Sequence, residues 1–183
     1  MSCFSIKKAI LCVSISSLLY TLGCSTVRIR EGVFFPPHEK YTISIPGKGW
    51  EPIRVGKEDM ALWHRQYHSM IAIISSEIEN KEFSLEMLNR HLFLGMTGKK
   101  IISKEFVLVD NQSALHTILE GEMDSNKLKI DSYVIKVGDK VYDLVCWAPA
   151  DSFDPVKDDF ENMVRTFRFT KTNSLRAEVL REY

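Results

Sequence analysis

The chain contains 183 residues, with 24 basic and 24 acidic side chains and a hydrophobic content of 45%. This length fits one domain of ordinary size with short appendages, and the composition excludes a disordered chain or a protein with many membrane spans. The balance of charges argues against a nucleic-acid-binding protein that works through a large basic surface.

The N-terminal stretch is organised like an export signal. Lys7 and Lys8 provide a positive n-region, and residues 9–22 follow without a charged side chain. As a helix this apolar stretch would be about 21 Å long, which is shorter than the ~30 Å hydrocarbon core of a bilayer. The pattern therefore predicts a signal peptide over residues 1–23 rather than a permanent transmembrane helix.

The signal ends in Thr21, Leu22, Gly23 and Cys24, which together resemble the bacterial lipobox. Gly23 is the small residue that precedes the cleavage point in this motif, and Cys24 supplies the thiol that is lipidated, whereas Thr21 departs from the usual Leu. The resemblance implies cleavage between Gly23 and Cys24 and an anchor of at least two acyl chains, which binds a bilayer stably. Ser25 replaces the Asp that marks inner-membrane retention in many Gram-negative lipoproteins, so the outer membrane, on its periplasmic face, is favoured. The alternative is an ordinary signal peptide that contains Cys24.

Removal of the signal changes the composition of the chain. Lys7 and Lys8 leave without any acid, so the mature protein becomes slightly acidic. Cys3 and Cys12 also leave and Cys24 is lipidated, so Cys146 would be the remaining free thiol. We therefore expect a fold that depends on its hydrophobic core rather than on a disulfide.

Residues 24–38 are expected to form the lipidated N-terminus and a flexible tether. This segment has no apolar periodicity and contains Arg28, Arg30 and the pair Pro36 and Pro37. Two arginines are too few for a polybasic membrane anchor.

Four short strands are predicted next, at residues 41–45, 50–55, 60–67 and 70–78. In the first, Tyr41, Ile43 and Ile45 alternate with polar residues. The last is apolar on both faces, which is typical of a central strand that is covered on both sides.

A helix should follow these strands. Ser84 is a suitable N-cap, and one apolar stripe is formed at helical spacing by Leu85, Leu88, Leu92 and Met96. Four more strands are predicted at residues 100–109, 113–123, 127–137 and 140–148. Their short polar links at 124–126 and 138–139 predict that the last three form an antiparallel meander.

The final core element is a predicted helix capped by Asp154, with Pro155 in its first turn. Its apolar stripe consists of Phe160, Met163, Val164 and Phe167. Residues 170–183 are expected to be a charged C-terminal tail. The order of elements predicts an α+β fold in which an antiparallel β-sheet is flanked by helices.

Residues 39–169 resemble the PsbP-like class, which includes photosystem extrinsic subunits, Mog proteins and DcrB-type lipoproteins. The resemblance rests on Ile45-Pro46 with Trp50 behind it, on the strand over residues 141–145, and on the closing apolar helix. It implies a PsbP-like α/β/α sandwich and a habit of binding partners. It implies no reaction.

Catalytic and metal-binding patterns are weak in this chain. His64 and His68 fall in or beside a predicted strand, where four residues separate side chains by ~13 Å, too far to share an ion. His116 has no nearby ligand in sequence, and Cys146 lies within a strand as a small apolar side chain. We therefore expect no catalytic residues, no metal and no cofactor.

The expected function is that of a non-enzymatic, membrane-anchored envelope lipoprotein that serves as a protein-interaction or accessory module for an envelope protein, without nucleic acid. Weak candidates for a binding surface are Trp50, Trp63 and Trp147. One alternative is a small-molecule or lipid carrier with a pocket between sheet and helix. Another is an enzyme whose residues meet only on folding, such as His116 near Asp143.

Overall fold

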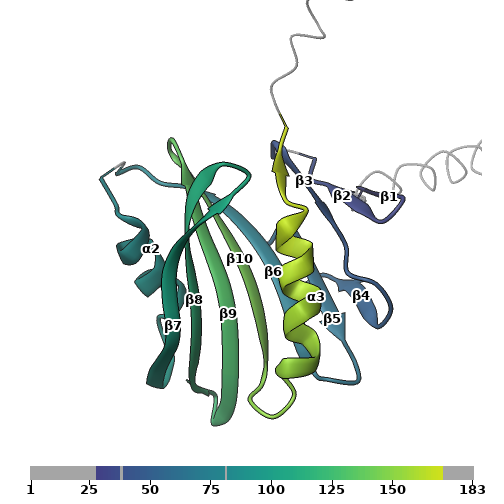
Figure 1. Cartoon of the computed structure of the whole chain (residues 1–183), viewed down its shortest axis with the longest axis vertical. Coiled ribbons are helices and arrows are strands. Elements are labelled where there is room, and N and C mark those ends of the chain that lie inside the picture. Colours follow the sequence, from purple (N-terminus) through teal and green to yellow (C-terminus); the bar gives the residue numbers. More distant parts are fainter. Residues whose placement is uncertain (1–27, 38, 81, 171–183) are drawn as a thin grey trace, which may run out of the picture.

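The computed structural model describes residues 28–37, 39–80 and 82–170, which form two antiparallel sheets and two helices (Figure 1). The smaller sheet has the order β1-β2-β3-β11, and its strands are Arg28–Arg30, Val33–Phe35, Tyr41–Ser44 and Arg168–Phe169. The larger sheet has the order β4-β5-β6-β10-β9-β8-β7. Its strands, in chain order, are Trp50–Ile53, Met60–His64, Ser69–Glu77, Thr97–Val109, Gln112–Met123, Asn126–Val137 and Lys140–Pro149.

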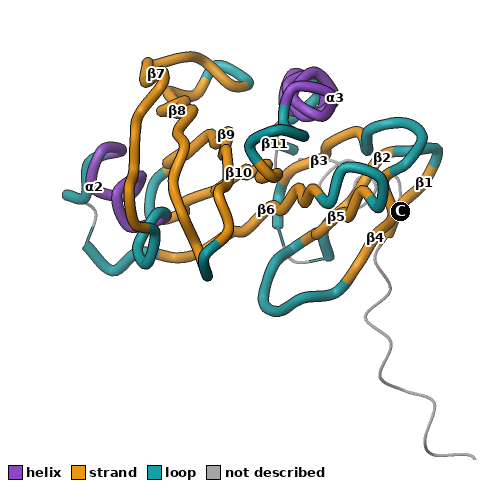
Figure 2. The backbone as a smooth tube through the Cα atoms, turned by 90° about the horizontal axis from the view of Figure 1, so that it is seen from below, coloured by secondary structure: helices purple, strands orange, loops and turns teal. Residues whose placement is uncertain are grey.

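The two helices, α2 (Leu85–Leu92) and α3 (Asp154–Arg165), lie on opposite sides of the large sheet (Figures 1 and 2). The alternation of side chains in β10 shows this division, since Leu144 and Cys146 belong to the core under α3 while Val145 packs with Phe93 and Met96, which follow α2. The fold is therefore α+β, with an antiparallel sheet flanked by helices as the sequence predicts.

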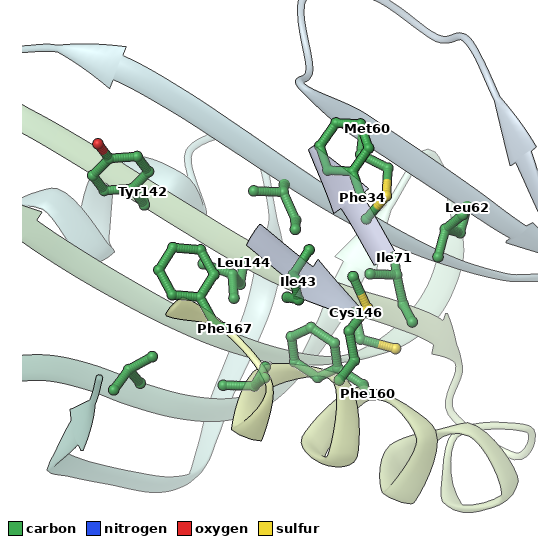
Figure 3. Close-up of a cluster of buried hydrophobic side chains, with 14 of the residues drawn as sticks. Phe34, Ile43, Met60, Leu62, Ile71, Tyr142, Leu144, Cys146, Phe160 and Phe167 are labelled. Carbon is green, nitrogen blue, oxygen red and sulfur yellow. The ribbon is translucent and has the colours of Figure 1, made fainter. Parts of the chain in front are cut away.

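The larger core fills the space between α3, the small sheet and the α3 side of the large sheet. It contains Phe34 and Ile43 from the small sheet, Phe160 from α3, and Phe167, which precedes β11 (Figure 3). The ring of Tyr41 stacks on that of Phe167 with centroids 4.9 Å apart. The four residues of the predicted apolar stripe are all buried, but only Phe160, Met163 and Val164 lie in α3, whereas Phe167 follows the end of the helix.

Tight turns set the register of the meander from β7 to β10. Asp110 and Asn111 both have positive φ, as do Asp124 and Ser125, which is the requirement of a type I′ hairpin turn. Gly138 supplies the positive φ between β9 and β10. The predicted meander is confirmed and extends to β7, which pairs with β8.

The structure differs from the expected flexible tether over residues 28–35. These residues form β1 and β2, and β2 pairs with β3. Phe34 is fully buried in the larger core, so burial of one aromatic side chain orders a segment without apolar periodicity. Residues 1–27, with the predicted signal peptide, Gly23 and Cys24, lie outside the described residues, as do residues 171–183 of the predicted tail.

The end of α2 and the start of α3 depart slightly from the predictions. Helix α2 begins after Ser84, whose Oγ accepts a hydrogen bond from the backbone N–H of Met87, but it ends at Leu92, so Met96 lies beyond it. Helix α3 has Phe153 at its N-cap, and Asp154 is its first residue rather than its cap. Asp154 still places a negative charge at the positive end of the helix dipole.

Candidate functional site

A recess opens on the α3 side of the large sheet, between α3 and the hairpin of β7 and β8. Its volume is about 660 Å3. Polar and charged side chains dominate its lining, which includes Glu105, His116, Tyr133, Glu161, Val164 and Arg165. We refer to this space as the α3 recess.

The strand register brings the polar side chains of the α3 recess together. Glu105 on β7 lies opposite His116 on β8, and His116 lies opposite Tyr133 on β9. Directly opposed residues of antiparallel strands share a face, so these three form a row across the sheet. The ring of Tyr133 stacks on that of His116 with centroids 4.2 Å apart and holds the imidazole in place.

A buried ion pair lies at the base of the recess. Oδ1 of Asp131 is 2.8 Å from Nε2 of His116, and both side chains are buried. On the other side of the ring, Nδ1 of His116 lies 3.4 Å from Oε1 of Glu105, whose side chain is 63% exposed. When His116 is protonated, both of its ring nitrogens donate to these carboxylates, because ionised carboxylates only accept hydrogen bonds.

The pKa values of the pair follow from this geometry. Burial by itself lowers the pKa of His116, but the hydrogen bonds and charges of Asp131 and Glu105 outweigh it, so the pKa is raised above its usual range. Burial raises the pKa of Asp131, and the hydrogen bond and charge of His116 oppose that rise. The charge of each residue thus offsets part of the cost of burying the other.

The remaining carboxylates of the lining already have partners. Glu161 on α3 lies 3.3 Å from Nζ of Lys157 and 3.7 Å from a guanidinium nitrogen of Arg165. Asp110, in the turn between β7 and β8, accepts a hydrogen bond of 2.8 Å from the backbone N–H of Phe169. This contact holds the tip of the hairpin against β11 and closes one end of the recess.

A second hollow of about 640 Å3 lies beyond the hairpin tip, and Asp110, Asn111 and Arg168 line both spaces. Its main polar feature is an ion pair in which Nζ of Lys140 donates to both carboxylate oxygens of Glu39 at 2.8 Å. This hollow contains no buried pair comparable with His116 and Asp131 among the residues that line it.

The hypothesised pairing of His116 with Asp143 is wrong. Asp143 on β10 lies opposite Val134, the neighbour of Tyr133, so it faces the α2 side of the sheet while His116 faces the α3 side. Its Oδ1 is buried without a hydrogen-bond partner among the described residues. Burial raises the pKa of Asp143 to about 7. The carboxylate that His116 does contact is Asp131, which the sequence analysis did not single out.

The three tryptophans do not form a shared patch. Met70 on β6 lies between Trp63 on β5 and Trp147 on β10 and is directly opposite both. The rings of the two tryptophans are 6.0 Å apart on the α2 side of the sheet. Trp50 is buried in the larger core, and its Nε1 donates to Oδ2 of Asp159 on α3. The sheet therefore separates Trp50 from the other two.

The other candidate residues occupy structural positions. The His64 ring is buried and stacks on Tyr67, whereas His68 lies in the turn after β5 with its ring near Trp63. Cys146 is fully buried, as expected for a small apolar side chain. No cluster of metal-ligating side chains occurs within the part of the chain that the structure describes.

Strand β7 forms one margin of the large sheet and presents a second candidate surface. It is 13 residues long and pairs only with β8 among the described strands. Four large apolar side chains on it are between 47% and 74% exposed, namely Ile101, Ile102, Phe106 and Leu108. We call this unpaired margin with its four side chains the β7 edge.

Comparisons with known proteins bear on the fold. No protein-family model and no curated protein matches the chain in sequence. The structure is similar to that of cyanobacterial PsbP (CyanoP) from Synechocystis sp. PCC 6803, with a TM-score of 0.56 and 16% identity, over 81% of this chain and 98% of that protein. The fold is PsbP-like. The sequence resemblance over residues 39–169 thus predicts the fold correctly.

Two further structures resemble the PsbP-like domain. LpqN of Mycobacterium tuberculosis, which is involved in cell envelope biogenesis, has a TM-score of 0.58 and 12% identity, over 73% of this chain and 86% of LpqN. A protein of Bacteroides thetaiotaomicron has a TM-score of 0.51 and 10% identity, over 72% of this chain and 46% of that protein. In the described part of the chain, no helix has the length and apolar character needed to span a membrane.

Proposed function

We propose that this chain is a non-enzymatic accessory protein of the cell envelope, in which a lipid on Cys24 holds a PsbP-like domain at the membrane. The domain binds an envelope protein through the β7 edge and needs no cofactor to do so. The membrane is the outer membrane, with the domain on its periplasmic face.

The observation that carries the interaction is the exposure of the β7 edge. An unpaired strand offers a row of backbone donors and acceptors to which an extended segment of another protein can add as a further strand. Proteins commonly protect such margins with short strands or cover, whereas β7 is long and displays Phe106 and Leu108 to solvent. A partner strand would cover both side chains and satisfy the free backbone groups.

The envelope location has two independent supports. The segment that ends in Gly23 and Cys24 resembles a lipobox, and LpqN, a structural neighbour, is involved in cell envelope biogenesis. A lipid anchor would keep an accessory domain beside membrane-bound partners, where even a weak strand-to-strand contact benefits from a high local concentration.

The anchor can be tested by metabolic labelling with radioactive palmitate. The full chain should incorporate label and fractionate with the outer membrane, and Cys24→Ala should abolish both results. Cys146→Ala is the matched control, because Cys146 is fully buried within β10 and should not be lipidated. An unlabelled wild-type protein would rule out the anchor.

The interaction can be tested with a photo-crosslinking amino acid in intact cells that produce the protein. Placed at Phe106 or Leu108, it should yield a discrete adduct with one envelope protein. Placed at Val55, which is also exposed but lies beyond β4 at the opposite margin of the sheet, it should not. Equal crosslinking at both margins would contradict a specific role for the β7 edge.

A lipid carrier receives little support from the geometry. Such a protein needs a largely apolar cavity, whereas the space under α3 is filled by side chains such as Phe160 and Phe167. The α3 recess that remains beside the core is lined by carboxylates, guanidinium groups and the imidazole of His116.

A further inference from the structure

We propose that the α3 recess binds a small organic carboxylate, whose carboxylate group accepts a hydrogen bond from Nδ1 of His116 and whose apolar part packs against Val107 and Val164. This binding site lies beside the β7 edge, with which it shares Leu108, and it does not depend on a protein partner.

The donor in this site is fixed by Asp131. A buried carboxylate at 2.8 Å from Nε2 sets the orientation of the His116 ring, and Tyr133 stacks on its face. Nδ1 therefore points towards Glu105 at the lining of the recess. In the protonated ring it is an N–H donor of a positively charged imidazolium. Such a group favours an anionic acceptor over a neutral one.

Glu105 already places a carboxylate at this position. The distance from its Oε1 to Nδ1 of His116 is 3.4 Å, which is longer than the roughly 2.7–2.9 Å of a strong charge-assisted hydrogen bond. Its side chain is mostly exposed and can turn into solvent at little cost. Glu105 therefore marks the position of a ligand carboxylate and competes with it for the N–H of Nδ1.

The rest of the lining suits a small molecule with one negative charge. Val107 and Val164 provide apolar surface on opposite walls, and the volume of about 660 Å3 lies in the range of ligand sites. Arg165 also lines the recess, and its side chain is 72% exposed, so its guanidinium can add a second charged donor. The other lining acids, Glu161 and Asp110, are already engaged by Lys157 and by the backbone N–H of Phe169.

Binding should depend on pH through His116. The charged or titratable groups that face it are Glu105 from β7, Asp131 and Tyr133 from β9, and Glu161, Lys157 and Arg165 from α3. When pH rises and His116 loses one proton, the shorter hydrogen bond to Asp131 keeps the remaining proton on Nε2, and Nδ1 ceases to donate. A ligand carboxylate then loses its main partner, so its affinity should fall.

The test uses the full chain labelled with 15N-histidine and sodium hexanoate as the probe. Hexanoate should produce saturable shifts of the His116 ring nitrogens in NMR spectra, and the affinity should fall at alkaline pH. Hexan-1-ol, which has the same apolar chain without the charge, should produce no saturable shift. Equal binding of both compounds, or the absence of any His116 shift with hexanoate, would overturn the proposal.

Three variants distinguish ligand binding at this site from a merely structural role of the pair. Glu105→Gln removes the competing carboxylate and should tighten hexanoate binding several-fold, because the competent state is more populated. Glu51→Gln makes the same change at an exposed carboxylate on β4 and should leave affinity unchanged. Weaker binding by Glu105→Gln, or an equal gain in both variants, would contradict the assignment. The His116→Gln/Asp131→Asn double variant, which buries no unpaired charge, should fold and fail to bind.

Discussion

Nε2 of His116 and Oδ1 of Asp131 are 2.8 Å apart on neighbouring strands, and Asp131 is completely shielded from solvent. Two ionisable groups are thus buried together on one face of the large sheet. Desolvating a pair of ions is costly, and removing one partner leaves the other without compensation. The pair therefore makes the stability of the domain sensitive both to mutation and to pH.

Replacement of His116 by Ala should destabilise the domain by about 3–5 kcal/mol near neutral pH, the usual cost of leaving a buried charge unpaired. Urea denaturation followed by Trp fluorescence measures this change. His91→Ala, at an exposed position on α2, is the matched control and should cost less than about 0.5 kcal/mol. Similar effects of the two substitutions would show that the pair of His116 and Asp131 makes no particular contribution to the free energy of unfolding.

The pair also predicts the direction of a pH effect on the free energy of unfolding. Because the pKa of His116 is raised in the folded state, its contribution is fully present below its unfolded value of about 6.5 and is lost as pH rises through the folded value. The stability advantage of the wild type over His116→Gln/Asp131→Asn should therefore be largest below about pH 6.5 and shrink as the pH rises above it. Denaturation series at several pH values give this difference, and an advantage that grows with pH would contradict the charge assignment.

Asp143→Asn should stabilise the domain at neutral and alkaline pH. Burial raises the pKa of Asp143 to about 7, so the folded state loses stability as pH rises from the unfolded value near 3.8 towards 7. The substitution should gain about 2–4 kcal/mol at about pH 8 and little at about pH 4. Thermal denaturation at both pH values measures the gain. Asp158→Asn, on the exposed part of α3, should change stability little at either pH.

Gly121→Ala should disturb the contact between β8 and the segment that follows α2. A Cβ at this position would lie 2.9 Å from Cε of Met96 and 3.1 Å from the backbone oxygen of Thr97, which cannot easily move. Overpacking of this kind costs about 1–3 kcal/mol. Gly47→Ala, where a Cβ meets no atom within 4 Å, should be nearly neutral in the same denaturation assay. A larger loss at Gly47 would reverse this interpretation.

Phe34→Ala tests whether the segment before β3 belongs to the folded domain. Phe34 is fully buried, and truncation of a buried Phe costs about 3–5 kcal/mol. Its neighbour Phe35 is 39% exposed, so Phe35→Ala should cost much less. If both substitutions proved harmless in urea denaturation, β1 and β2 would contribute nothing to stability.

Most of the elements could be predicted because their sequence patterns are local. The stripe of Phe160, Met163 and Val164 specifies a helix with one buried face, and the short polar links at 124–126 and 138–139 specify antiparallel strands on either side of them. Strand β11 could not be predicted, since two residues carry no periodicity and Arg168 and Phe169 pair with β3 only through tertiary contacts.

Part of the candidate site could be predicted from the turn between β8 and β9, because this turn sets the register of the two strands. A two-residue turn at Asp124 and Ser125 places Met123 opposite Asn126, and counting back from there sets His116 opposite Tyr133, diagonal to Asp131. The predicted link spans three residues, 124–126, and a shift of one residue moves every side chain to the other face. Because of this difference in register, the sequence did not predict the ion pair. The recess itself depends on how far α3 lies from β9, and this distance is set by the tertiary structure alone.

The early start of β1 sets the distance between the domain and its proposed anchor. Ser25, Thr26 and Val27 separate Cys24 from β1, so the chain from Cys24 to Arg28 can reach at most about 14 Å. On a lipidated protein this short linker would hold the small sheet close to the lipid headgroups. The β7 edge lies at the opposite side of the molecule from β1 (Figures 1 and 2). Such a protein would be an oriented adaptor that points its partner-binding strand away from the bilayer, rather than a domain that swings freely above it.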